Sequence, residues 1–157
     1  MQLTIIMPQV FCAVKALILR GDRFLVIKQN LGEGYGSVWD LPGGRMDYGE
    51  SPYDTLRREI QEEVCLEVGE FMPVGVWWFF RKHDKNQVVC STFICEAKDG
   101  KVDLNQNPAS ESIEKFSWVT KEEFLERDYP VSHESLKKLV AGLDFWGNYG
   151  KSPNVSL

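Results

Sequence analysis

Histidine and long apolar runs are scarce in this sequence of 157 residues. Its two histidines, His83 and His133, are far from any serine or cysteine signature, which argues against a catalytic triad. The apolar run from Val10 to Leu19 is short and interrupted by Lys15, and no basic segment precedes it. The sequence therefore predicts neither a membrane span nor a signal peptide, and we expect a cytoplasmic protein.

Metal-binding cysteine patterns and an excess of basic residues are also missing. The four cysteines, Cys12, Cys65, Cys90 and Cys95, show no C-x-x-C spacing. Cys90 and Cys95 lie an odd number of positions apart in one apolar run, so they face opposite sides of a strand and are not expected to form a disulfide. The formal net charge is −5, which argues against stable nucleic-acid binding.

The most informative segment runs from Gly44 to Leu66 and predicts a helix. Ser51 suits the N-cap position and Pro52 the first helical position, with Asp54 three residues after the cap. An apolar stripe at helical spacing follows, made of Tyr53, Leu56, Ile60 and Val64. We expect this stripe to pack on a core.

Three carboxylates, Glu59, Glu62 and Glu63, recur at spacing i, i+3, i+4 and so share one side of this helix. At about 100° per residue, that side is centred about 110° from the apolar stripe, so the carboxylates can point into a cleft. Like charges this close are destabilising unless a positive group lies between them. A hard cation such as Mg²⁺ meets that need, although a solvated acidic face is the commoner reading of such a helix.

The preceding loop, Leu41-Pro42-Gly43-Gly44, favours the metal reading. Two glycines allow close approach of the backbone to a ligand, and exposed N–H groups there can meet phosphate oxygens. Arg58 lies one turn from both Asp54 and Glu62, so it can neutralise and orient the acidic face.

Loop and helix together resemble the Nudix hydrolase signature, G-x5-E-x7-R-E-U-x-E-E-x-G-U, where U is a bulky aliphatic residue. The matching residues are Gly44, Glu50, Arg58, Glu59, Ile60, Glu62, Glu63 and Leu66. Cys65 departs from the pattern, because the family has glycine there. Cysteine enters the left-handed region less freely, so the helix end is expected to differ slightly.

The resemblance implies the fold, an α/β/α sandwich of the Nudix type with a mixed central sheet. It also implies Mg²⁺, or alternatively Mn²⁺, held by Glu59, Glu62 and Glu63, with Gly44 and Glu50 near the metal. Arg58 orients the carboxylates, and the general base is Glu59 or a loop glutamate, Glu111 or Glu114. The substrate is a small nucleotide derivative, and a homodimer is compatible with the family.

The reaction implied by the resemblance is hydrolysis of a phosphoanhydride bond in a nucleoside diphosphate linked to another group X. A nucleoside triphosphate, ADP-ribose and a sugar nucleotide all remain open as substrates. The alternative is a Nudix-like module that binds nucleotides or regulates without turnover. Such modules usually lose motif carboxylates, whereas none is missing here.

Substrate contacts are expected from Gly43, Gly44, Trp77, Trp78 and Arg81. Trp77 and Trp78 begin an aromatic run on a predicted strand, and neighbours on a strand face opposite sides, so only one of them can line the cleft. That residue is a candidate for base stacking, with core burial as the default reading. Arg81 lies with Lys82 and Lys85 at a hairpin tip, where a phosphate or a partner could meet them.

The chain is predicted to consist of a leader (1–9), one domain (10–143) and a tail (144–157). Within the domain we expect two hairpins, the motif helix and a C-terminal pair of helices. The predicted strands are 10–19, 23–28, 71–80, 88–96 and 117–119, the helices after the motif are 121–126 and from 132 or 133 to 143, and the loops are 29–38 and 103–113.

Overall fold

The computed structural model describes residues 7–107, 112–126 and 128–144. Glu111, residues 1–6 of the predicted leader and residues 145–157 of the predicted tail lie outside these ranges, so the domain boundaries stay a prediction. In chain order the described elements are β1 (Val10–Arg20), β2 (Arg23–Asn30), β3 (Ser37–Asp40), β4 (Gly43–Arg45), α1 (Pro52–Val64), β5 (Met72–Phe80), β6 (Gln87–Glu96), β7 (Ile113–Val119), α2 (Lys121–Glu126) and α3 (Glu134–Ala141).

The strands form one mixed sheet, as predicted. Its main order is β3-β2-β1-β6-β5, with β4 paired to β1 and β7 paired to β2. β1 and β6 run parallel, from Val10 opposite Gln87 to Leu19 opposite Glu96, whereas the other strand pairs are antiparallel. Because β4 pairs with the middle of β1, the glycine loop lies over the centre of the sheet.

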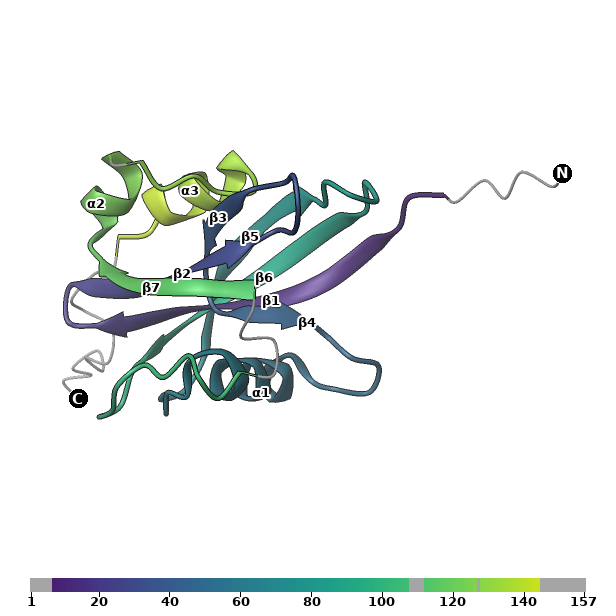
Figure 1. Ribbon diagram of the computed structural model, residues 1–157. Coiled ribbons are helices and arrows are strands. Elements are labelled where there is room, and N and C mark those ends of the chain that lie inside the picture. The colour runs from purple at the N-terminus through teal and green to yellow at the C-terminus, as the bar shows by residue number, and fades with distance from the viewer. Residues whose placement is uncertain (1–6, 108–111, 127, 145–157) are drawn as a thin grey trace, which may run out of the picture.

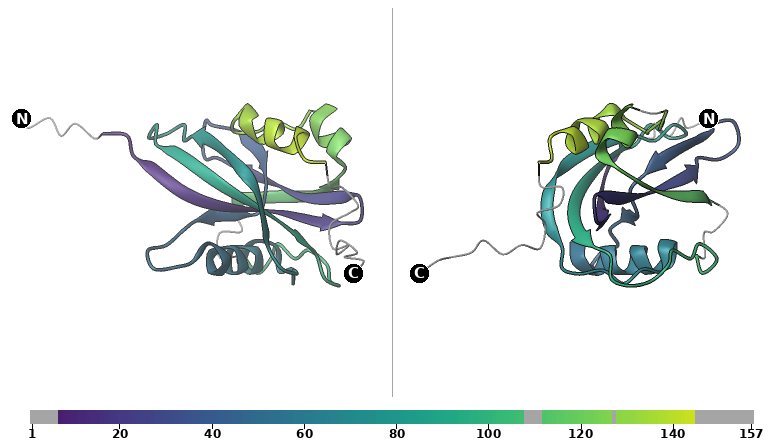
Figure 2. Two further views of the ribbon diagram at one scale, coloured as in Figure 1. Left: turned by 180° about the vertical axis from the view of Figure 1, so that it is seen from behind. Right: turned by 90° about the vertical axis from the view of Figure 1, so that its left-hand side faces the viewer.

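Helices cover both faces of this sheet, with α1 on one side and α2 and α3 on the other (Figures 1 and 2). Each interface has its own apolar core. Leu56, Ile60 and Val64 of α1 are fully buried against one face, as the helical stripe predicted, whereas Tyr53, the first residue of that stripe, is 47 % exposed. Phe124 of α2 and Leu136 of α3 are fully buried against the other. The predicted α/β/α sandwich is confirmed.

Helix α1 begins and ends where its sequence signals lie. Ser51 Oγ accepts a hydrogen bond of 3.1 Å from the N–H of Asp54, and Pro52 opens the helix. At the other end Cys65 adopts the left-handed conformation, with φ 54° and ψ 33°, and its N–H donates to Ile60 O at 3.1 Å. Cysteine thus takes the conformation that glycine favours at this position.

Helix α3 packs against the edge strand β5. His133 is its N-cap, and Ser135 bridges helix and strand. The Trp78 N–H donates to Ser135 Oγ at 3.1 Å, and the same hydroxyl donates to Trp78 O at 2.8 Å. A Cβ on Gly75 would lie 2.5 Å from Leu139 Cδ1, so glycine at this position lets the helix approach the strand closely.

Several element boundaries differ from the sequence prediction. The expected loop 29–38 contains the end of β2 and the start of β3, and β4 was not predicted. Both missed strands are short and are held by pairing with distant strands rather than by local pattern. β7 begins at Ile113 rather than 117, and α3 ends at Ala141 rather than 143. Thr120 caps α2 as expected, since its Oγ1 accepts from the Glu123 N–H at 3.1 Å.

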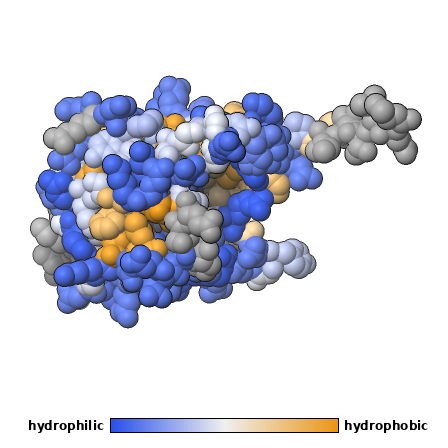
Figure 3. Space-filling view, in the orientation of Figure 1, coloured by the Kyte–Doolittle hydropathy of each residue, from blue (hydrophilic) through white to orange (hydrophobic). Residues whose placement is uncertain are grey.

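The surface agrees with the charged composition. The face seen in Figure 3 is mainly hydrophilic, with apolar side chains gathered in the area below β7. In the described ranges, no helix is long and apolar enough to cross a membrane. All four cysteines are free, and Cys90 and Cys95 are buried in the cores on opposite faces of the sheet, as expected.

Candidate active site

The glycine loop lies directly against the carboxylates of α1. The Gly43 N–H donates to Glu63 Oε1 at 3.1 Å. A Cβ on Gly44 would lie only 2.5 Å from Glu59 Oε1. A Cβ on Gly43 would overlap Val14 O, and its φ of 134° lies in a region that favours glycine. The two glycines are therefore needed because the loop passes between β1 and the acidic side of α1.

Arg58 holds the motif carboxylates together. Its Nε and a terminal nitrogen bind Glu50 in bidentate fashion at 2.8 and 2.9 Å, and another nitrogen binds Glu59 at 3.1 Å and approaches Glu62 at 3.5 Å. These hydrogen bonds from Arg58, with one from Thr55, lower the pKa of Glu50 to about 2. Hydrogen bonding to Glu50 in turn raises the pKa of Arg58 above its ordinary value. Arg58 thus contacts the carboxylates that it is predicted to orient, through charge-assisted hydrogen bonds.

Glu63 is the buried member of the group, with 6 % of its surface exposed. Its Oε1 accepts the Gly43 N–H, but Oε2 has no hydrogen-bond partner among the described residues. Burial, reinforced by the nearby Glu59 and opposed by Lys15, raises the pKa of Glu63 to about 8. An unpartnered buried carboxylate oxygen needs a cation or a proton, so this residue fits a divalent metal ion.

A cavity of about 350 Å³ lies in front of these carboxylates. It is lined by Gln29, Gly43, Gly44, Glu59, Glu62, Glu63, Asn107, Ser112 and Ile113. Oxygen donors dominate this lining, which suits Mg²⁺ or Mn²⁺. Among the described residues, no three acidic, histidine or cysteine side chains are already arranged around one metal position. The predicted carboxylates therefore share a cavity, and their use as ligands stays a proposal.

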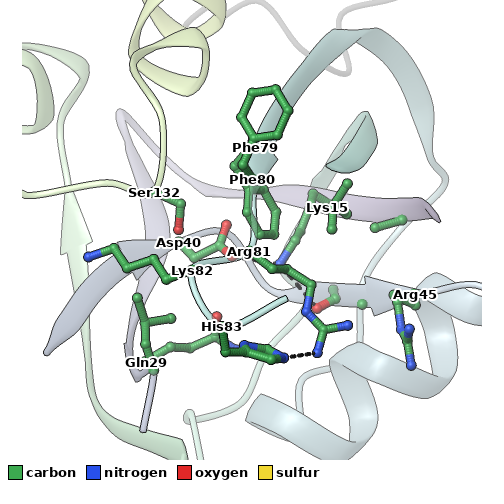
Figure 4. A pocket seen from close by; sticks show the side chains of 15 residues that line it. Lys15, Gln29, Asp40, Arg45, Phe79, Phe80, Arg81, Lys82, His83 and Ser132 are labelled. Atoms are coloured by element: carbon green, nitrogen blue, oxygen red, sulfur yellow. Dashed lines mark hydrogen bonds and ion pairs between the residues drawn. The ribbon is translucent and has the colours of Figure 1, made fainter. Parts of the chain in front are cut away.

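A second cavity, of about 330 Å³, adjoins the first (Figure 4). Both are lined by Gln29, Gly43 and Gly44, so the glycine loop separates two halves of one site. The other residues of the second cavity are Ala13, Lys15, Leu31, Asp40, Arg45, Phe79, Phe80, Arg81, Lys82, His83, Val88 and Ser132. Arg81, a predicted substrate contact, lines this cavity.

Neither Trp77 nor Trp78, the predicted stacking residues, lines either of these two cavities. The two indoles do face opposite sides, because Trp77 is fully buried under α3 and Trp78 is 42 % exposed beside His133. The aromatic side chains that line the second cavity are instead Phe79 and Phe80, at the end of the same strand. Only the pairing of β5 with β6, which sets where the strand ends, could identify them.

Of the two predicted loop glutamates, the structure describes only Glu114. Glu111 lies outside the described residues. Glu114 lines neither cavity, and its carboxylate accepts from Ser37 Oγ at 2.7 Å and lies 3.4 Å from Lys28 Nζ. These contacts, led by the Ser37 hydrogen bond, lower the pKa of Glu114 and make it a weaker proton acceptor.

The second cavity contains a buried ion pair that was not predicted from the sequence. Lys15 and Asp40 are 5 % and 4 % exposed, and Lys15 Nζ lies 2.7 Å from Asp40 Oδ2. Burial opposes the charge of Lys15, but Asp40 and other neighbours outweigh it and raise its pKa. The signal was present, since a lysine inside an apolar strand needs a buried partner.

Comparison with known proteins agrees with this geometry. A model of the NUDIX domain matches residues 11–139. This chain belongs to the NUDIX family. A MutT-like protein from Streptomyces ambofaciens is 29 % identical over 140 residues, covering 89 % of this chain and 81 % of that protein. An 8-oxo-dGTP diphosphatase from Proteus vulgaris is 32 % identical over 47 residues, covering 30 % and 42 %.

Solved structures share the fold of this NUDIX protein. A MutT NUDIX hydrolase from Burkholderia pseudomallei superposes with a TM-score of 0.71 at 21 % identity, covering 87 % of this chain and 99 % of that one. A MutT protein from Methanosarcina mazei Go1 gives a TM-score of 0.68 at 22 % identity, covering 87 % and 94 %. The protein is a NUDIX pyrophosphohydrolase with the family's sandwich fold.

Proposed function

We propose that this protein catalyses the Mg²⁺-dependent hydrolysis of a phosphoanhydride bond in a nucleoside diphosphate linked to another group X. The observation that carries the proposal is Oε2 of buried Glu63, which has no hydrogen-bond partner in the described part of the chain and lies in an acidic cavity beside Gly43. A bound divalent cation would satisfy this oxygen and would neutralise the phosphates of the substrate.

In this reaction Glu59, Glu62 and Glu63 hold the metal ion, and Gly43 and Gly44 let the diphosphate approach closely. When bound, Mg²⁺ supplies charge neutralisation and a lowered pKa for the attacking water. Arg58 fixes the carboxylates through its contacts with Glu50 and Glu59. Glu59 is our candidate for the general base, with Glu111 as the alternative from the loop.

The second cavity holds the nucleoside in this proposal. Phe80 is 53 % exposed and lines the cavity, and its ring also makes an edge contact with His133 at 6.5 Å. An exposed aromatic ring at this place can stack on a base. The name of the Proteus vulgaris relative, an 8-oxo-dGTP diphosphatase, makes nucleoside triphosphates the first substrates to test. ADP-ribose and sugar nucleotides complete the panel.

The test is a substrate panel with Mg²⁺ in which released phosphate, pyrophosphate and nucleoside monophosphate are measured. Activity should disappear with excess chelator and return with Mg²⁺ or Mn²⁺. Glu62→Gln keeps the size of the side chain and removes its charge, so turnover should fall at least about a hundredfold with the fold intact. Glu67→Gln, an exposed change outside the acidic cavity, is the matched control.

Two results would contradict the proposal: near-normal turnover in folded Glu62→Gln, or full activity in excess chelator. A protein that binds nucleotides without hydrolysing any member of the panel would instead support the silent binding module.

A further inference from the structure

The two halves of the site carry opposite charge. The cavity in front of α1 is lined by Glu59, Glu62 and Glu63 and by no lysine or arginine among the described residues. The second cavity is lined by Lys15, Arg45, Arg81 and Lys82, with Asp40 as its single described carboxylate. A chain of net charge −5 therefore concentrates positive charge at one place beside its reaction centre.

Two of these four cations, Arg45 and Lys82, are not neutralised by a carboxylate among the described residues. Asp40 and Lys15 form an ion pair, so their two charges cancel. Arg45 stacks over the Phe11 ring at 4.7 Å, and Lys82 Nζ contacts the Tyr35 carbonyl at 3.4 Å. In the described part of the chain, neither has a carboxylate within salt-bridge distance, whereas one terminal nitrogen of Arg81 forms an ion pair with Asp84 at 3.5 Å and also contacts His83 Nε2.

The cations lie on different walls of the cavity. Arg45 belongs to β4 and follows Gly44 directly, so it is next to the place where the diphosphate would react. Arg81 and Lys82 follow β5 in the turn to β6. In Figure 4, Arg45 and Lys82 lie at opposite ends of the view, with Phe80 and Arg81 between them.

Phosphates directly attached to the reacting diphosphate would lie near Arg45. An anion near Arg81 and Lys82 would be separated from these phosphates by the group that stacks on Phe80. A cavity of about 330 Å³ has room for a nucleoside with such an additional group.

We propose that Arg81 and Lys82 bind a second phosphate, carried as a monoester on the ribose of the nucleoside that occupies this cavity. This inference rests on the proposed function, and it narrows the substrate to nucleoside diphosphate derivatives whose ribose is phosphorylated at the 2′ or 3′ position. Arginine and lysine recognise phosphate through charge-assisted hydrogen bonds, with Arg81 as the bidentate donor.

The test is a binding titration of the purified protein with AMP, GMP and their 2′,5′- and 3′,5′-bisphosphates at low ionic strength. At least one bisphosphate should bind about tenfold more tightly than its monophosphate, because each phosphate contact here is charge-assisted. Added salt should reduce this preference, since the cations are near the surface.

Arg81→Gln and Lys82→Gln should each reduce the preference several-fold. Lys85→Gln is the matched control, because Lys85 lies in the same turn, carries the same charge and does not line the cavity. The inference would be overturned by equal dissociation constants for mono- and bisphosphates, by no binding of any of them, or by an equal loss in the Lys85 variant.

A turnover comparison separates this inference from the proposed function. ADP-ribose and its 2′-phosphorylated form differ only in the added phosphate, and the latter should have the higher kcat/KM. Bisphosphate preference in binding without hydrolysis of any panel substrate would support the second phosphate site and overturn the proposed function. Hydrolysis of panel substrates without any preference for ribose phosphate would support the proposed function and overturn the second phosphate site.

Discussion

Lys15 Nζ and Asp40 Oδ2 form a buried ion pair of 2.7 Å beside the glycine loop. The same ammonium group donates to the carbonyl oxygens of Leu41 and Gly43, both at 3.3 Å. Lys15 thus holds the backbone on both sides of Pro42 in place, and the Gly43 N–H in turn donates a hydrogen bond to Glu63. A residue on β1 thereby determines where the loop lies relative to α1.

Removing one partner of this pair should be strongly destabilising. Lys15→Met leaves a buried Asp40 without compensation, so the free energy of unfolding in urea should fall by about 3–5 kcal/mol. Adding Asp40→Leu to Lys15→Met should recover part of this loss, because it removes the unpaired charge. Additive losses in the double-mutant cycle would show that the two side chains do not interact energetically.

Gly44→Ala should reduce activity more than stability. The added Cβ would lie 2.5 Å from Glu59 Oε1, the end of a flexible side chain that can move without unfolding the domain. Because Glu59 is a proposed metal ligand and base, we expect turnover to fall at least about tenfold with little change in Tm. In the control Gly69→Ala, the new Cβ meets only Glu96 O at 3.8 Å, so turnover should stay at the wild-type level.

The raised pKa of Glu63 predicts a pH-dependent stability in metal-free protein. Its folded-state pKa is about 8 against an ordinary value of 4.5, so between these values the folded state holds a proton that the unfolded state has lost. The stability contributed by protonated Glu63 is complete below pH 4.5 and is lost as pH rises towards 8.

Thermal unfolding in chelator, compared between wild type and Glu63→Gln, isolates this effect. The Tm of the wild type should fall relative to that of Glu63→Gln as pH increases from about 5 to about 8. A difference that is constant over this range would mean that Glu63 titrates normally.

Cys65→Gly should be nearly silent for catalysis and neutral to mildly stabilising. Relief of the left-handed strain favours the change by about 1–2 kcal/mol, while the greater freedom of glycine in the unfolded chain offsets about half of that. Cys12→Gly makes the same chemical change on strand β1 and should be destabilising by about 0.5–1 kcal/mol. A strong loss of turnover in Cys65→Gly would assign a function to this thiol.

Phe80→Ala should chiefly raise KM if the second cavity holds a base. Stacking stabilises bound substrate and transition state alike, and its loss should weaken the binding free energy by about 1–3 kcal/mol. Val76→Ala, on the same strand and 55 % exposed, is the control for general effects on β5. An unchanged KM in Phe80→Ala would mean that base recognition lies elsewhere.

The sequence predicted those parts of the protein that depend on local pattern. The cap at Ser51, the apolar stripe through Ile60 and the acidic side of α1 all follow from spacing within one helix. β3 and β4 were missed because they are short and exist through pairing with β2 and β1.

The contacts that complete the site are long-range. Lys15 and Asp40 are brought together across 25 positions, and the turn after Phe80 meets the loop that contains Tyr35 through Lys82. No local periodicity contains this information, because it depends on strand order and register. Within the aromatic run, Phe79 and Phe80 line the second cavity, whereas the predicted Trp77 and Trp78 do not.

Ser135 limits how another chain can associate with the outer edge of strand β5. An outer strand normally offers unpaired N–H and C=O groups on which another strand can add. At Trp78 both groups are already bonded to one hydroxyl from α3, and Leu139 of the same helix lies against Gly75. A neighbouring molecule cannot extend the sheet past β5 at Trp78 without first displacing α3, so this helix also protects the protein against edge-to-edge aggregation.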